Sequence, residues 1–243
     1  MKHKLLCLAL LCSSAAIAGP ADYVYLPNVE YGEREIDFKF GSAKGAGGED
    51  RHVASLGIGY GAKEWWFTEF YLKYKREGSL GTHLDAVEWE NKFQLTETGK
   101  YPIDIGFITE FEAPRQRSEG YEFRFGPLLQ SEFGRLQLNA NLLLERVYRS
   151  TDGAAHSTEF GYQWQAKYRW RPEFEWGLQG FGEMGKWNNW DSREQQNHRL
   201  GPAILGKIAL GGHQALRYNA AWLLGASSAA PTHTFRLQAE YEF

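Results

Sequence analysis

Charged side chains at alternate positions are the residues of this chain best suited to chemistry. An acidic group lies in the middle of the sequence: Glu88, Glu90, Glu110, Glu112 and Glu122. A basic group follows in the second half: Lys167, Arg169, Arg171, Arg217 and Arg236. A two-residue spacing places neighbours on the same face of a β-strand. If the two groups faced each other across water, their field would orient or select a polar solute.

The same charges also have a structural interpretation. Charges in an enclosed space must find partners or water, because burying an unpaired charge costs several kcal/mol. In a narrow barrel, the acidic and basic groups would pair across the lumen and plug it. The diameter of a barrel grows with its number of strands, and an intermediate barrel is compatible with both a pore and a plug.

Histidines recur where alternating segments begin: His52, His83, His156, His198 and His233. Histidine serves as a metal ligand and as a general base, and a lipid hydrolase would need a Ser or Asp beside it. Ser157 follows His156, but neighbours in a strand point to opposite faces. The spacing fits no metal motif. We therefore assign no catalytic residue, metal or cofactor. We expect histidines at a lipid interface, and keep an outer-membrane phospholipase or lipid A deacylase as the alternative.

The elements that carry these residues are strands, because apolar and polar side chains alternate along them. In the segment 158–171, one face carries Phe160, Tyr162, Trp164, Ala166, Tyr168 and Trp170. The other face carries Glu159, Gln163, Gln165, Lys167, Arg169 and Arg171. The pattern predicts about twelve strands, at 29–40, 51–61, 65–77, 84–97, 102–113, 120–132, 136–149, 158–171, 174–185, 198–210, 215–225 and 233–243.

The connections between these segments alternate in length. The longer set covers 41–50, 78–83, 114–119, 150–157, 186–197 and 226–232. Short turns lie between them, and the parity of the strands puts every longer connection at the same end. Outer-membrane barrels have short periplasmic turns and longer external loops, which fits this order. Gly57, Gly59 and Gly61 alternate within one strand, so we expect them to relieve crowding in the lumen rather than to bind a dinucleotide.

The N-terminus has the features of a secretory signal. Basic residues precede the apolar stretch 5–11, and Ala16 to Ala18 form a small-x-small cleavage site. We expect residues 1–18 to be a cleaved signal peptide, 19–28 a short periplasmic lead and 29–243 one barrel domain. Both cysteines, Cys7 and Cys12, lie in the signal, so the mature chain carries no thiol chemistry.

Composition narrows the class further. The net charge of −3 gives no reason to expect a nucleic-acid partner, and the chain holds 9 Trp, 13 Tyr and 15 Phe. Beyond the signal, no apolar stretch reaches the length of a membrane helix, and only helices and closed barrels satisfy the backbone in lipid. A soluble barrel such as a lipocalin, with its aromatic side chains inside, is the alternative. However, the face opposite the aromatics carries too many charges to be the outer surface of only eight strands.

The whole mature length resembles a bacterial outer-membrane β-barrel. Tyr241, Glu242 and Phe243 end the last strand on an aromatic residue, which resembles the signal that the barrel-insertion machinery recognises. The resemblance implies an all-β, single antiparallel transmembrane barrel in the outer membrane. It also implies contacts with outer-membrane lipid and lipopolysaccharide. A small porin or solute channel for small polar solutes is the expected function, and a structural barrel with a plugged lumen stays open.

Overall fold

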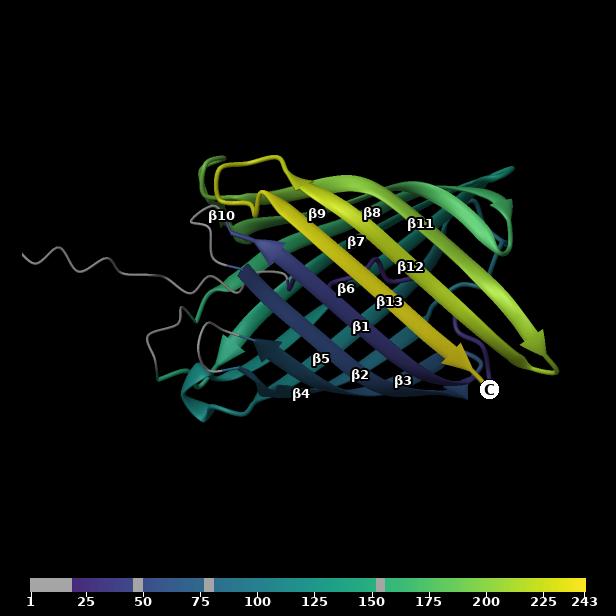
Figure 1. Cartoon of the computed structure of the whole chain (residues 1–243), viewed down its shortest axis with the longest axis horizontal. Coiled ribbons are helices and arrows are strands. Elements are labelled where there is room, and N and C mark those ends of the chain that lie inside the picture. The colour runs from purple at the N-terminus through teal and green to yellow at the C-terminus, as the bar shows by residue number, and fades with distance from the viewer. Residues whose placement is uncertain (1–18, 46–49, 77–80, 152–155) are drawn as a thin grey trace, which may run out of the picture.

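Twelve long strands close into one antiparallel barrel in the described part of the chain (Figure 1). The computed structural model describes residues 19–45, 50–76, 81–151 and 156–243, so the predicted signal peptide, 1–18, lies outside the described residues. The long strands are β1 (Arg34–Lys44), β2 (Asp50–Lys63), β3 (Trp66–Arg76), β4 (Thr82–Gln94), β5 (Asp104–Pro114), β6 (Tyr121–Phe133), β7 (Leu136–Tyr148), β8 (Thr158–Arg171), β9 (Phe174–Lys186), β11 (Asn197–Gly211), β12 (Gln214–Gly225) and β13 (His233–Glu242).

Hydrogen bonding runs around the whole sheet. β1 pairs with both β2 and β13, while β9 pairs with both β8 and β11. The short strand β10 (Asn189–Trp190) adds to the end of β9. Since a closed sheet leaves no open edge, its backbone groups are satisfied without water. Among the described residues, no helix has the length and apolar character needed to cross a bilayer.

The two faces of the sheet differ as the alternation predicts. Gln163 and Gln165 on β8 are 4% and 3% exposed and point inward. On the outer face, Trp176 and Trp222 are 52% and 50% exposed, and Phe70 stacks on Trp89 with ring centroids 5.7 Å apart. A continuous apolar belt of this kind is the surface that a barrel presents to lipid. The expected fold class is confirmed.

Most predicted bounds shift by one to three residues, and two differences are informative. The first strand, expected at 29–40, spans Arg34–Lys44 instead, because the residues before it turn into the barrel. The connection 95–103 between β4 and β5 is longer than the short turn expected there. It is held by its own hydrogen bonds, from Gly99 N to Asp104 Oδ1 at 2.8 Å and from Ile105 N to Thr96 Oγ1 at 2.8 Å. These local hydrogen bonds satisfy backbone N–H groups where β4 and β5 are no longer paired.

The segment 19–28 was expected as a periplasmic lead, but the structure places it inside the barrel. Figure 1 shows its purple trace behind β13 and β1, in the space that the strands enclose. Val24 packs in a buried cluster with Phe181 and Leu205, and Tyr25 packs in a second cluster with Leu128 and others. Apolar side chains on two inward-facing patches thus bury the segment, which the hydrophobic effect favours over an exposed lead.

Glycines on the lumen face make room for residues 19–30, which we call the N-terminal segment. A Cβ on Gly61 would lie 1.9 Å from the carbonyl oxygen of Glu30, and a Cβ on Gly41 would lie 2.2 Å from the carbonyl carbon of Pro20. Both distances are far below van der Waals contact, so any larger residue would displace the segment. Gly41 lies near the long-loop end of β1, and Gly61 lies near the short-turn end of β2. The segment therefore runs between the two ends of the lumen.

Candidate functional site

The N-terminal segment divides the lumen into two vestibules. At the short-turn end, a cavity of about 760 Å³ is lined by charged side chains that include Glu33, Lys167 and Arg217. We call it the short-turn vestibule. At the other end, a cavity of about 220 Å³, the long-loop vestibule, is lined by residues such as Lys73 and Arg124. Tyr23 and Tyr25 line both cavities and stand between them.

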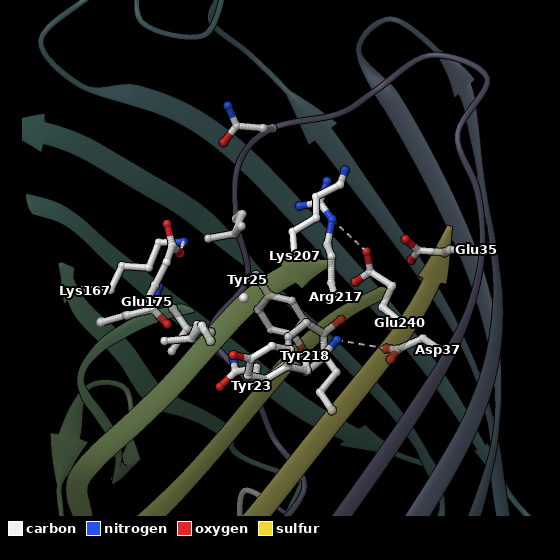
Figure 2. Close-up of a pocket in the computed structure, with 18 of the residues that line it drawn as sticks. Tyr23, Tyr25, Glu35, Asp37, Lys167, Glu175, Lys207, Arg217, Tyr218 and Glu240 are labelled. Atoms are coloured by element: carbon white, nitrogen blue, oxygen red, sulfur yellow. Dashed lines mark hydrogen bonds and ion pairs between the residues drawn. The ribbon is translucent and has the colours of Figure 1, made fainter. Parts of the chain in front are cut away.

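Figure 2 shows Tyr23 and Tyr25 lining the short-turn vestibule, with Lys167 and Glu175 on one side and Arg217 on the other. Their rings pack edge to face, with centroids 4.6 Å apart. Burial raises the pKa of Tyr23 and of Tyr25 well above the usual value of a phenol. The two phenols are therefore neutral in the lumen, and they act as donors rather than as charges.

Polar contacts anchor the segment along its length. Near its start, the Arg236 guanidinium donates to the carbonyl oxygen of Asp22 at 2.6 Å. In its middle, the Tyr23 hydroxyl donates to the Glu90 carboxylate at 3.1 Å. Near its end, the backbone N–H of Val29 donates to a side-chain oxygen of β4 at 2.7 Å. The segment thus occupies a defined path and does not fill the lumen at random.

A lysine joins the segment to the wall beside it. The Lys39 ammonium lies 3.8 Å from the ring centroid of Tyr23 and 3.6 Å from that of Tyr71. It also pairs with Asp37 at 3.5 Å, and Asp37 accepts a hydrogen bond from the Tyr71 hydroxyl at 2.8 Å. Cation–π attraction is strongest where water is excluded, and the Lys39 side chain is only 7% exposed. This cage therefore contributes to holding Tyr23 in place.

Lys73 on β3 neutralises part of the acidic group. Its ammonium pairs with the Glu88 carboxylate at 2.9 Å and with the Glu112 carboxylate. The three residues come from β3, β4 and β5, which are neighbours in the sheet. The pairs therefore run along one wall, whereas the sequence suggested charges that face each other across the lumen.

Arg124 on β6 neutralises most of the remaining acidic group. It pairs with Glu110 at 3.1 Å, with Glu122 at 3.4 Å and with Glu145 at 2.7 Å. We use the name ionic wall for the charged side chains of β3 to β7 that surround Lys73 and Arg124. A guanidinium has more N–H donors than an ammonium and holds them in a planar fork, so an arginine can donate to several carboxylates at this position.

The basic group lies mostly at the short-turn end, and it too is paired locally. Lys167 pairs with Glu175 at 2.6 Å, and Arg169 pairs with Glu132 at 2.8 Å. Arg171 stacks over the ring of Trp170, with 4.7 Å between guanidinium carbon and centroid. The acidic and basic groups are thus separated along the barrel axis as well as around it.

Arg217 and Arg236 occupy different depths of the lumen. Arg217 pairs with Glu240 at 3.4 Å and also with Glu242, so it belongs to the short-turn vestibule. Arg236 is 1% exposed and reaches the N-terminal segment, with a second hydrogen bond to Gln179 at 3.2 Å. Arg236 is thus brought to the constriction, while Arg217 is not.

A second wall is lined by amides. We use the name amide wall for the buried, inward-facing amides of β6 to β9: Gln130, Gln137, Asn139, Asn141, Gln163, Gln165 and Gln179. These side chains donate to one another, for example from Gln137 to Gln130 at 3.0 Å and from Asn141 to Gln163 at 2.9 Å. A chain of mutual amide bonds satisfies buried polar groups without charge.

The sequence analysis missed the residues that complete the site. Lys73 and Arg124 have the same inward parity as the glutamates around them, so a count of every inward-facing charge would have found them. Tyr23 and Tyr25 precede the first strand, and neither alternation nor spacing indicates that they lie inside the barrel. Their position depends on apolar patches that distant strands contribute.

Two of the histidines near the strand starts, His198 and His233, contact aromatic side chains among the described residues. His198 and Tyr162 share a hydrogen bond at 2.9 Å and stack with centroids 5.9 Å apart, and the other ring nitrogen of His198 lies 2.8 Å from Gln196 Oε1. The ring of His233 lies 5.7 Å from that of Trp222. These contacts are those of aromatic side chains at the outer rim, and they favour an interfacial role over catalysis.

The comparison with solved structures shows the fold of bacterial outer-membrane β-barrels. An outer-membrane channel from Pseudomonas putida F1 has a TM-score of 0.62 and 14% sequence identity, over 93% of this chain and 99% of that one. The NanC porin has a TM-score of 0.56 and 10% identity, over 86% and 98%. The KdgM porin has a TM-score of 0.55 and 10% identity, over 86% and 99%. No protein-family model and no curated protein matches the sequence.

Proposed function

We propose that this protein is a small solute channel of the bacterial outer membrane, with the N-terminal segment as its constriction. The observation that carries the proposal is the pair of cavities, about 760 and 220 Å³, on opposite sides of Tyr23 and Tyr25. A barrel whose function was purely structural would gain stability by filling such space, because packed interiors avoid large voids. Two cavities that are large enough for many water molecules and are lined by charged side chains instead support the passage of small polar solutes.

The similar structures support the same proposal at the level of class. The neighbours with a TM-score above 0.5 include an outer-membrane channel and two porins. The outward aromatic belt supports contact with outer-membrane lipid and lipopolysaccharide. The sequence-based expectation of a porin-like channel therefore agrees with the fold, and its outer-membrane location is part of the proposal.

Single-channel recording in planar bilayers tests the channel. We expect a small conductance from the wild type and a larger one from the double variant Tyr23→Ala/Tyr25→Ala, because smaller side chains widen the passage between the vestibules. Tyr101→Ala, at a tyrosine that is 54% exposed in the connection between β4 and β5, is the matched control and should conduct as the wild type does. A silent wild type with leaky Tyr23→Ala/Tyr25→Ala would favour a plugged structural barrel.

Phe243 is proposed as the assembly signal. Its backbone N–H donates to the carbonyl oxygen of Arg34 at 2.9 Å, and its ring stacks on that of Tyr241 with centroids 5.8 Å apart. The ring is 43% exposed at the short-turn end, where the insertion machinery could contact it. Deletion of Phe243 should reduce the yield of heat-modifiable barrel in the outer membrane. An unchanged yield would remove this proposal alone.

A further inference from the structure

Three glutamates stand side by side next to the constriction. Glu69 on β3 is directly opposite Glu90 on β4, and Glu90 is directly opposite Glu110 on β5. All three point into the barrel and are 2%, 3% and 3% exposed. Directly opposite like charges destabilise a sheet, so such a row carries a cost that neutral residues would avoid. We call Glu69, Glu90 and Glu110 the carboxylate row.

The carboxylate row has fewer cationic partners than it has charges. Within the described ranges, Glu69 Oε1 and Glu110 Oε1 are buried without a hydrogen-bond partner. The other oxygen of Glu110 accepts from Arg124 at 3.1 Å, and Glu90 accepts from the neutral hydroxyl of Tyr23. Glu69 and Glu90 line the short-turn vestibule together with Tyr23, so the carboxylate row forms part of the wall that a solute in this vestibule would meet.

The contacts of Lys39 indicate which kind of ligand the lumen beside the carboxylate row can stabilise. Its ammonium lies between the rings of Tyr23 and Tyr71 and beside a carboxylate. Tyrosine faces and carboxylate oxygens are the groups that stabilise a desolvated ammonium or alkali cation. Tyr23 belongs to both features, since its ring contacts Lys39 and its hydroxyl contacts the carboxylate row.

We propose that the carboxylate row is a cation-binding site at the constriction, and that the channel prefers monovalent cations to anions. The inference rests on the proposed channel function and specifies its solute class. Carboxylates that line a narrow passage attract cations and repel anions. The ionic wall at the long-loop end does not counter this, because Lys73 and Arg124 are each paired with two or more carboxylates.

The test is the reversal potential of single channels in planar bilayers under a KCl gradient. The wild type should be more permeable to K⁺ than to Cl⁻. The double variant Glu69→Gln/Glu110→Gln removes the two carboxylates that each have an unpartnered oxygen, but keeps Glu90 as the acceptor for Tyr23, so the segment stays anchored. Its K⁺ preference should fall toward no selectivity. The matched control Glu64→Gln/Glu97→Gln changes two exposed glutamates of the short-turn connections and should behave as the wild type.

The outcomes separate this inference from the channel itself. A silent wild type overturns the proposed function and this inference with it. A conducting wild type without cation preference overturns the inference alone, as does a preference that Glu69→Gln/Glu110→Gln leaves unchanged. Heat-modifiable migration in gels reports whether each variant folds. If the double variant does not fold, Glu69→Gln alone is recorded, with the same direction of change expected.

Discussion

The ionic wall and the amide wall line the same lumen and arise from the same alternation, yet they treat buried polarity differently. In the ionic wall, Arg124 serves several carboxylates, and one oxygen of Glu110 has no partner among the described residues. In the amide wall, side chains such as Gln137 and Gln130 donate to one another. The ionic wall therefore depends on charge balance, whereas the amide wall satisfies its buried polar groups without charge.

The largest expected effect comes from removing the central cation of the ionic wall. Arg124→Met leaves Glu110, Glu122 and Glu145 without their shared partner, and breaking a buried ion pair costs about 3–5 kcal/mol. Urea unfolding in phospholipid vesicles measures the change. Arg169→Met is the control, because the Arg169–Glu132 pair is 35% and 38% exposed and should contribute less than about 1 kcal/mol. Equal costs would mean that burial does not set how much the ion pairs of the ionic wall contribute.

A second variant pair tests the register that builds the amide wall. Trp164 faces outward on β8, while Gln163 faces the lumen and accepts from Asn141 at 2.9 Å. Trp164→Arg should cost about 2–4 kcal/mol if the residue lies near the middle of the bilayer. Gln163→Arg should cost less, because the lumen face is polar and the added charge does not enter lipid. The free energy of unfolding measures both, and a reversed order would place β8 in the opposite register.

Nearly all of the strands could be predicted from the sequence, for a physical reason. Each strand has lipid on one face and a polar lumen on the other, so the two-residue period is imposed along its whole length. The predicted segment 158–171 coincides with β8, and 136–149 ends one residue from β7. The first strand was wrong by several residues, because its start depends on where the preceding chain goes.

The site was less predictable than the strands. Strand parity shows which face a side chain is on, but its depth depends on the tilt and stagger of the whole barrel. Glu112 and Arg217 were therefore expected to oppose each other, although they line different vestibules. The position of Tyr23 follows from patches around Leu128 and Leu205, which only the closed barrel brings near the N-terminal segment.

The smallest expected effect comes from the amide wall itself. Gln165 donates to Asn139 at 3.3 Å and contacts Gln179, so Gln165→Leu leaves buried amide groups with one partner fewer. An unsatisfied buried polar group costs about 1–3 kcal/mol, and the leucine recovers part of this by burying apolar surface. The change removes no charge, so the reversal potential under a KCl gradient should equal that of the wild type. Stability and selectivity are measured on the same preparation. A shift in selectivity at Gln165→Leu as large as that at Glu69→Gln/Glu110→Gln would show that the amide wall also contacts the solute, and that the division between the two walls is not functional.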